Sequence, residues 1–464
     1  MKILKLNKDG IHEYQQNRYP YLLIDEAEEV IPGVSAKGYK DLKEDEWFFK
    51  VHWPSDPNMP GMLQIESLVQ MCALSLLTMP GNKGKLVYLI SADKIKLKRK
   101  IVPNDRLLID DGRIVLGVLS IDNYIIDCEV ITGGELTNSK GINLQGGGLS
   151  ADALTNKDIE DMKHAAKIKV DFVAISFPRD AKDIKKARKM MKDCNCNAQI
   201  IAKIERADAL NHIEEIIKES DVIMIARGDL GVEVGDAALP PIQKSLIKKA
   251  RDMDRAVITA TQMMESMIEN KIPTRAEVFD VANAVIDGTD AVMLSGETSI
   301  GHYPDEAVKS MSRICEVAEK QRSVRESDHR INQRFETISE AVAMSSMYSA
   351  NHIGAKAICS LTETGGTCLW MSRISSGIPI YAFTRHTATR RRVALYRGVY
   401  PMKFDITHTD PLEANKQMID QLIEQNVVVE GDFVIITKGD LRGKRGATNN
   451  MKIIQVGQAL EHTL

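Results

Sequence analysis

Polar side chains that could do chemistry follow short apolar runs in the middle of the chain. The runs are QIIAKIE (199–205), DVIMIARGDLG (221–231), AVITATQM (256–263) and DAVMLSGET (290–298). Each is brief, rich in apolar residues and followed by a polar helical segment, which is typical of a buried strand. The carboxyl ends of parallel strands meet at one edge, so we expect their polar residues to gather there. These residues are Lys203, Glu205, Arg227, Asp229, Thr259, Thr261, Ser295 and Glu297.

The spacing of the charged residues favours a divalent-cation site. Lys203 and Glu205 lie two residues apart on one predicted strand, so both side chains should point to the same face. Glu205 and Asp229 end adjacent strands. Two such carboxylates suit Mg²⁺ (or Mn²⁺), which prefers oxygen ligands and keeps positions open for substrate oxygens.

The elements that would position this site are successive βα units. A fifth apolar run, VDFVAISFPR (170–179), precedes the others, and strands alternate with helical segments throughout. This alternation is the signature of a parallel sheet. Upstream, LTNKDIEDMKHAAK (154–167) predicts a helix with a capping box at Thr155 and Asp158. We therefore predict an α/β fold containing part of a TIM (β/α) barrel.

The motifs AKIER, ARGDLGVE, TATQMMESM and PTRAEVFDVANAVIDGTDAVMLSGET resemble pyruvate kinases in order and spacing. The resemblance implies transfer of a phosphoryl group from phosphoenolpyruvate to ADP. Lys203 would neutralise that group, and Thr261 would lie near the enolate carbon that takes up a proton. The implied roles are catalytic for Lys203, Arg227 and Thr261, substrate-binding for Gly228, Asp229 and Thr261, and metal-binding for Glu205 and Asp229.

The same resemblance shows what the chain lacks. It starts near residue 105 and runs to the end, so the first three strands of the barrel have no counterpart. In the family those strands bring a substrate-binding arginine, the ligands of K⁺ and part of the nucleotide site. K⁺ is therefore expected from the family, but its ligands are missing here. The chain should hold five of eight barrel strands, with exposed edges.

The helix that begins at Pro273–Thr274–Arg275 carries Glu277 and Asp280, with Asn283 on a later turn. These polar residues could form the rim of the active site or could serve as ordinary capping charges, and the sequence leaves both alternatives open.

A second α/β domain is predicted over 335–464, after the charged segment 319–335. FETISEAVAMSSMYSANHIG (335–354) predicts a capped helix. The turn TETGGT (362–367) lies between a strand and a helix, where free backbone N–H groups favour a phosphate. It matches the effector loop of the family, although a simple helix-start turn is the alternative. A sugar-phosphate or nucleotide effector would bind Thr362, Glu363, Thr364, Gly365 and Thr367, with Lys444 and Arg445 opposite.

Residues 1–107 follow a different pattern. An almost wholly apolar helix follows Pro60, and such a helix should be enclosed. The segment VHWPSDPNMPGMLQIESLVQ (51–70) resembles the 3-hydroxyacyl-(acyl-carrier-protein) dehydratases. The resemblance implies an α+β hotdog domain in which His52 is the base and Glu66 the acid, with acyl-carrier protein as partner. The alternative is a helix-start histidine and a buried glutamate with structural roles.

The join between the two patterns lies in RKIVPNDRLLIDDGRIVL (99–116), which resembles both families. We predict a hotdog segment (1–107), a remnant of the pyruvate kinase lid domain (108–148), barrel strands four to eight (149–320) and the C-terminal domain (335–464). The strands LLIDDGRIVLGVL and YIIDCEVIT belong to the lid remnant by resemblance. Whether they also complete the hotdog sheet is left open by the sequence.

Composition narrows the function classes. The 464 residues carry a formal net charge of −3, which offers no basic footprint for nucleic acid. No apolar run reaches membrane-spanning length, and the start lacks the apolar core of a signal peptide. Seven scattered cysteines indicate a reducing, cytoplasmic setting. The hypotheses are an impaired pyruvate kinase, a dehydratase, or a non-catalytic fusion that keeps effector binding and homo-oligomerisation.

Overall fold

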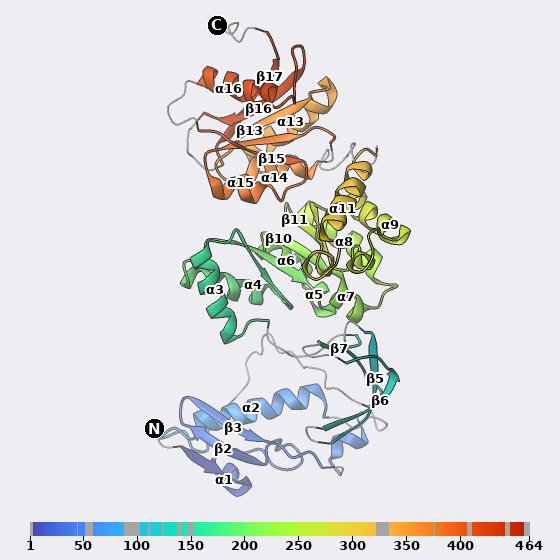
Figure 1. Ribbon diagram of the computed structural model, residues 1–464. Coiled ribbons are helices and arrows are strands. Elements are labelled where there is room, and N and C mark those ends of the chain that lie inside the picture. Colours follow the sequence, from blue (N-terminus) through green and yellow to red (C-terminus); the bar gives the residue numbers. More distant parts are fainter. Residues whose placement is uncertain are drawn as a thin grey trace. The chain divides into compact units, whose positions relative to one another are not determined.

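The computed structural model describes residues 3–43, 45–51, 59–87, 103–109, 112–122, 125–136, 141–146, 153–321, 334–374, 376–405, 411–440 and 446–458 (Figure 1). The chain divides into two compact units, Met1–Arg99 and Lys100–Leu464. Within the described ranges, no helix is both long and apolar enough to cross a membrane.

The first unit is a small α+β structure. Its antiparallel sheet has the order β1-β2-β3, and α2 packs against β2 and β3 (Figure 1). Met71 and Leu74 of α2 share a core with Ala27 and Val30. The elements are β1 (Leu4–Leu6), α1 (Lys8–His12), β2 (Glu26–Ile31), β3 (Ser35–Tyr39), a 3₁₀ helix (Trp47–Lys50) and α2 (Gly61–Leu77).

The apolar helix α2 is not enclosed on all sides within the described residues, which differs from the expectation for a hotdog domain. Met62 is 74% exposed and Leu68 64% exposed. The physical reason is that a sheet of three strands covers only one face of the helix. The further strands expected over 88–103 lie almost wholly outside the described residues.

The second unit begins with an antiparallel sheet of the order β6-β5-β4-β7. Leu107, Val118 and Leu144 form its small core. Among the described residues these strands pair only with one another, so the described parts of LLIDDGRIVLGVL and YIIDCEVIT form a sheet distinct from β1–β3. The strands are β4 (Arg106–Ile109), β5 (Ile114–Asp122), β6 (Ile125–Thr132) and β7 (Ile142–Leu144).

The five predicted barrel strands are confirmed as one parallel sheet of the order β12-β11-β10-β9-β8, and the sheet does not close within the described ranges. The capping box of Thr155 and Asp158 is also confirmed. The strands are β8 (Phe172–Ile175), β9 (Gln199–Ile204), β10 (Val222–Ala226), β11 (Ala256–Ala260) and β12 (Ala291–Val292).

Helices follow the strands as the βα alternation predicts. Side chains alternate along the strands, so Ile200, Ile223 and Val257 pack with the outer helices. The helices are α3 (Asn156–Ile168), α4 (Ala181–Asp193), α5 (Ala207–Leu210), α6 (Ile213–Glu219), α7 (Arg227–Val234), α8 (Leu239–Asp252), a 3₁₀ helix (Glu265–Ile268), α9 (Arg275–Asp287), α10 (Gly296–Ser299) and α11 (Pro304–Ala318).

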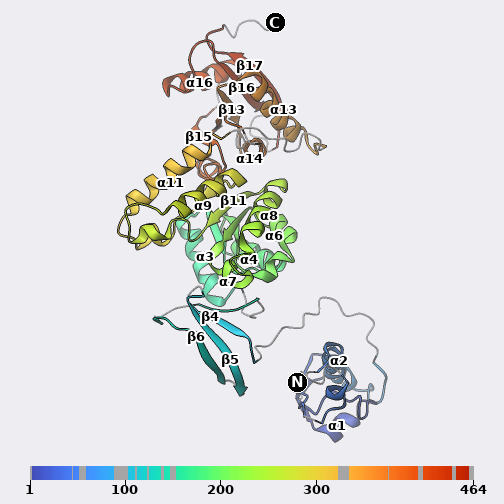
Figure 2. The ribbon, with the colours of Figure 1, turned by 90° about the vertical axis from the view of Figure 1, so that its right-hand side faces the viewer.

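The C-terminal domain has a mixed sheet of the order β15-β14-β13-β16-β17, with β17 antiparallel to its neighbour. Figure 2 shows α13 and α16 on opposite sides of β16. The elements are α13 (Ile338–Ile353), β13 (Ala357–Leu361), α14 (Gly366–Arg373), β14 (Ile380–Thr384), α15 (Thr387–Val393), β15 (Val399–Lys403), α16 (Pro411–Glu424), β16 (Phe433–Gly439) and β17 (Thr448–Gln455).

Candidate active site

Lys203 and Glu205 project from the carboxyl end of β9 on the same face, as their spacing predicts. The Lys203 Nζ lies 2.6 Å from Glu205 Oε1 and donates to Ser176 Oγ at 3.2 Å. Glu205 is only 1% exposed. Its Oε2 accepts the backbone N–H of Phe177 at 2.8 Å. The carboxylate and ammonium groups are therefore held in fixed positions before any substrate binds.

Burial raises the pKa of Glu205 above its ordinary value, and the hydrogen bond and positive charge of Lys203 oppose that rise. The negative charge of Asp229 raises the pKa further. The two carboxylates predicted to share a metal therefore lie near enough to repel each other.

The start of α7 brings Gly228 and Asp229 to the same edge. The N–H of Gly228 donates to Thr261 Oγ1 at 2.9 Å, and that hydroxyl donates to the carbonyl of Ala260 at 2.7 Å. Thr261 has φ 65°, which is strained for a β-branched residue. The chain after β11 is thus held in an unfavourable conformation that places the Thr261 hydroxyl against the turn carrying Asp229.

The guanidinium group of Arg227 is bound by other groups of the protein. Its Nη1 lies 2.7 Å from Asp280 Oδ1. Its Nη2 donates to the carbonyls of Thr261 at 2.8 Å and Gln262 at 3.1 Å. The side chain is buried. The geometry favours a positioning role, in which Arg227 holds the strained 261–262 segment, over direct contact with substrate.

The polar residues around α9 mostly serve the structure. Glu277 forms a capping box with Thr274 and accepts the N–H of Ser266 at 2.7 Å. Asn283 is exposed. The sequence left open whether these residues form the rim of the active site or act as capping charges. Glu277 acts as a cap, and Asp280 pairs with Arg227. Buried Glu297 likewise accepts two backbone N–H groups, those of Met264 and Ser295.

Within the described residues, a divalent cation at the carboxylate pair would need further ligands, such as water or substrate oxygens. No group of three or more His, Cys, Asp or Glu residues suited to a metal occurs in the part of the chain that the structure describes. Glu205 and Asp229 repel each other, and a cation would relieve that repulsion. Mg²⁺ typically binds one or two carboxylates together with water and substrate phosphates, so the donor set fits it.

The loop 362–367 of the C-terminal domain comprises the turn before α14 and the first two residues of that helix. Gly365 has φ 88°, and its N–H donates to Thr362 Oγ1 at 2.9 Å. The hydroxyl of buried Thr367 lies 2.8 Å from Thr448 Oγ1, whereas Thr364 is exposed. The carboxylate of Glu363 pairs with His386. Lys444 and Arg445, predicted to face this loop, lie outside the described residues.

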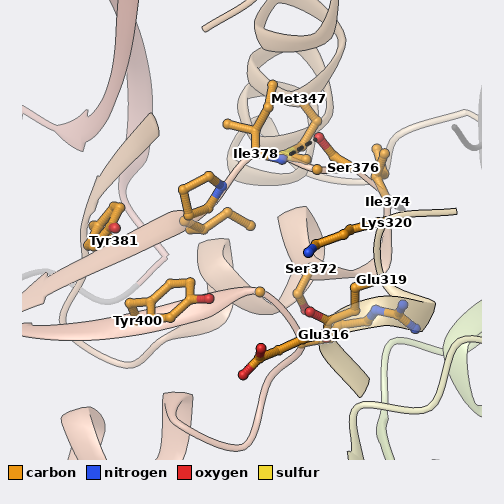
Figure 3. Close-up of a pocket in the computed structure, with 15 residues that line it drawn as sticks. Glu316, Glu319, Lys320, Met347, Ser372, Ile374, Ser376, Ile378, Tyr381 and Tyr400 are labelled. Atoms are coloured by element: carbon orange, nitrogen blue, oxygen red, sulfur yellow. Dashed lines mark hydrogen bonds between the residues drawn. The ribbon is translucent and has the colours of Figure 1, made fainter. Parts of the chain in front are cut away.

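A separate cavity of about 490 Å³ lies between the end of α11 and the start of β14 and β15 (Figure 3). Tyr381 and Tyr400 stack along one wall, with ring centroids 5.4 Å apart. Glu316 and Lys320 line another wall. None of the predicted site residues lines this cavity, so it is distinct from the edge that holds Lys203.

The predicted dehydratase pair is only partly described. His52 lies outside the described residues. Glu66 lies on α2 and is half-buried, and its Oε1 accepts Gln70 Nε2 at 3.0 Å. Gln70 also accepts the N–H of Leu23 at 2.8 Å and donates to the carbonyl of Tyr21 at 2.8 Å. Gln70 therefore connects Glu66 to the segment of Tyr21 and Leu23, which precedes β2.

Family models match most of the chain. The model "Pyruvate kinase, barrel domain" matches residues 75–308, and "Pyruvate kinase, alpha/beta domain" matches residues 340–454. The chain belongs to the pyruvate kinase family. Pyruvate kinase II of Salmonella typhimurium is 52% identical over 380 residues, which is 81% of this chain and 78% of the relative. Pyruvate kinase of Buchnera aphidicola from Schizaphis graminum is 55% identical over 371 residues, 79% of this chain and 77% of the relative.

The pyruvate kinase of Haemophilus influenzae is 53% identical over 357 residues, 75% of this chain and 74% of the relative. A third model, "FabA-like domain", matches residues 16–133. It overlaps the pyruvate kinase match from residue 75, and the segment 99–116 that resembles both families lies inside that overlap. The chain is thus a pyruvate kinase-family enzyme preceded by a FabA-like hotdog segment, which confirms the predicted fusion.

Proposed function

We propose that this pyruvate kinase-family chain transfers a phosphoryl group between phosphoenolpyruvate and ADP, and that its turnover is strongly impaired. The observation that carries the proposal is the fixed group of Lys203, Glu205 and Ser176 beside the Asp229 turn. Phosphoryl transfer needs positioning and charge neutralisation more than covalent chemistry by the protein. This edge supplies a fixed cation and paired carboxylates.

Each residue has a distinct part in the proposed mechanism. Lys203 binds the transferring phosphoryl group and neutralises the charge that develops on it. Glu205 and Asp229 would hold Mg²⁺ or Mn²⁺, which supplies charge neutralisation and orients the phosphate oxygens. The Gly228 N–H fixes the Thr261 hydroxyl at 2.9 Å, next to the proposed site of enolate protonation. Arg227 keeps this segment in place.

Impairment follows from the open sheet. The five strands leave both edges unpaired within the described ranges, whereas a closed (β/α)₈ barrel fixes its mouth from all sides. The absent strands would also supply a substrate-binding arginine and the ligands of K⁺, as the family resemblance implies. Loss of one preorganised electrostatic partner typically costs about 10²–10³ in rate.

The test is a coupled assay of the purified full chain with phosphoenolpyruvate, ADP, Mg²⁺ and K⁺. We expect activity above background but at least about 10²-fold below that of the Salmonella typhimurium relative measured alongside. No activity at any protein concentration would contradict the kinase proposal and favour a non-catalytic role. Turnover equal to the relative would show that the missing strands are dispensable.

The carboxylate pair predicts a pH-dependent cation site. Because the pKa of Glu205 is raised, protons compete with Mn²⁺ at a higher pH than at an ordinary carboxylate. As pH falls through that raised pKa, Glu205 becomes protonated and Mn²⁺ affinity should fall. Water-proton relaxation with Mn²⁺ measures this. Asp229→Ala should abolish the site, whereas Asp208→Ala, an exposed carboxylate nearby, should keep it.

The loop 362–367 is proposed to bind a phosphorylated effector, and the chain is proposed to self-associate as its family does. Thr367 is the residue to change, because its hydroxyl joins the helix start to Thr448 on β17. Thr367→Ala should weaken sugar-phosphate binding by about tenfold, since the hydrogen bond that holds the helix start against Thr448 is lost. Calorimetric titration with fructose 1,6-bisphosphate tests this.

A dehydratase activity is the second candidate, and the FabA-like match over residues 16–133 is the observation that favours it. Glu66 would act as the acid and His52 as the base, with an acyl-carrier protein delivering the substrate. Hydration of crotonyl thioester should then occur and should be lost in both Glu66→Gln and His52→Ala. Equal hydration by the wild type and both variants would reject this candidate without affecting the kinase proposal.

A further inference from the structure

Among the described residues, β8 ends the parallel sheet of the barrel and pairs with β9 alone, so its other edge is unpaired there. The carbonyl of Asp171 accepts the N–H of Gln199 at 2.9 Å, so Asp171 turns its carbonyl toward β9. Backbone groups alternate along a strand, and those of Phe172 and Ala174 therefore face away from β9. Outward N–H and C=O groups of this kind are a template for an added strand.

A cavity of about 360 Å³ lies beside this edge. It is bounded by α3 and β8, with Leu154, Met162, Ala165, Phe172 and Ile175 among its lining residues. These side chains are apolar, whereas Asp158 and Asp161 of α3 and Ser176 after β8 also line the cavity. The edge therefore combines unpaired backbone groups with a mostly apolar groove that also carries two carboxylates, and strand addition uses backbone groups together with side-chain pockets.

The groove has the position of a strand that should precede β8. Helix α8, which connects β10 to β11, contacts both of those strands. Helix α3 precedes β8, but it packs mainly against α4, and among the described strands β8 has only β9 as a neighbour. The Salmonella typhimurium relative is covered over 78% of its length, which leaves roughly a fifth of it without a counterpart here.

We propose that the groove between α3 and β8 binds a polypeptide carrying the N-terminal βα units of a pyruvate kinase-family barrel, whose last strand adds in parallel to β8. The proposal rests on the function proposed above, because a parallel strand brings its carboxyl end to the edge that holds Lys203. The added polypeptide thus completes the mouth of the barrel in trans.

A second copy of this chain fits the groove less well. The other open edge of the sheet is β12, which has 2 residues against 4 in β8. Pairing β8 with β8 about a twofold axis would make the strands antiparallel and would set the two active edges at opposite ends. A parallel barrel strand avoids both problems.

The experiment co-expresses the full chain with the part of Salmonella typhimurium pyruvate kinase II that its match to this chain leaves uncovered. We expect the two to co-purify, and turnover to rise by about 10²-fold or more over the chain alone. In the complex, hydrogen exchange of the Phe172 and Ala174 amides should slow. Failure to co-purify, or a complex in which both amides exchange as fast as in the free chain, would overturn the proposal.

Paired variants locate the contact. Ala174→Pro removes an outward N–H from an edge strand and should weaken binding at least about tenfold, while Ala174→Val keeps that N–H and should bind normally. Ala165→Glu places a charge in the groove and should also prevent binding. His164→Glu adds the same charge at an exposed position of α3 and should not. If Ala174→Pro and Ala165→Glu both bound the added polypeptide as tightly as the unchanged chain does, the groove would be rejected as the site.

The remaining outcomes separate this proposal from the kinase proposal. Binding without a rise in turnover keeps the docking site and contradicts the kinase function. Ordinary turnover by the chain alone keeps the function and contradicts the need for a partner. Slow hydrogen exchange of the Phe172 and Ala174 amides in the chain alone would show that the edge of β8 is already paired. If the slow exchange depends on protein concentration, a second copy pairs with the edge; if it does not, another segment of this chain does.

Discussion

Replacing Lys203 by methionine is expected to lower the phosphoryl-transfer rate of the chain by about 10²–10³-fold. The ammonium group is fixed between Glu205 Oε1 at 2.6 Å and Ser176 Oγ at 3.2 Å, so it meets the phosphoryl group without reorganisation. Methionine keeps most of the side-chain length and removes only the charge and its hydrogen bonds. The rate constant is measured in the coupled assay with saturating Mg²⁺.

A second consequence distinguishes this role from a structural one. Without Lys203 the buried Glu205 loses the contact that opposes the rise of its pKa. Mn²⁺ binding should therefore weaken most at low pH, whereas loss of fold would weaken it at every pH. Lys182→Met, at an exposed lysine on α4, is the control and should keep both activity and metal binding. Unchanged turnover in Lys203→Met would remove Lys203 from the mechanism.

The roles of individual polar residues were harder to predict than their location. Strand ends predicted that Lys203, Glu205 and Asp229 would gather, because parallel strands share one carboxyl edge. Spacing alone could not tell that Arg227 turns back onto Asp280 and the 261–262 carbonyls, since that depends on the positive φ of Thr261. Such a conformation is fixed by packing from several elements and leaves no local pattern in the sequence.

The fold was predictable where local pattern and burial agree. Runs such as VIMIA at β10 are buried along their whole length and have the composition of central parallel strands. Strand β15 has only a weak local pattern because Pro401 interrupts it, and proline is tolerated there because β15 is an edge strand. For helix α2 the local pattern and the burial disagree. Its apolar surface predicts a fully enclosed helix, but the three described strands cover only one of its faces.

The contact between the barrel and the C-terminal domain also has no recognisable motif in the sequence. Arg373 and Asp290 form an ion pair whose side chains are 1% and 0% exposed. Arg373 Nη1 donates to Asp290 Oδ2 at 2.9 Å, and Asp290 also accepts the N–H of Val257 at 2.9 Å and that of Arg397 at 3.0 Å. One carboxylate thus joins β11, the start of β12, α14 and the approach to β15.

The same region holds further cations. Arg251 Nη2 donates to the carbonyl of Arg373 at 2.7 Å. Burial, followed by the positive charge of Arg373, lowers the pKa of Arg251 to about 10. Asp290 therefore balances the buried Arg373 and the partly buried Arg251, and its removal would leave their repulsion uncompensated. A buried charge that loses its partner costs more than the pair contributes, because desolvation is no longer repaid.

Arg373→Met and Asp290→Asn are each expected to lower the free energy of unfolding by about 3–5 kcal/mol. The double variant should be destabilised by less than the sum of the two, because it leaves one buried charge fewer to compensate. Urea denaturation of the full chain measures all three, with Arg391→Met as a control, since Arg391 pairs with Asp171 at the surface of the same contact. That exposed pair should contribute only about 0–1 kcal/mol. Additive single effects would show that Arg373 and Asp290 stabilise the contact independently rather than as a pair.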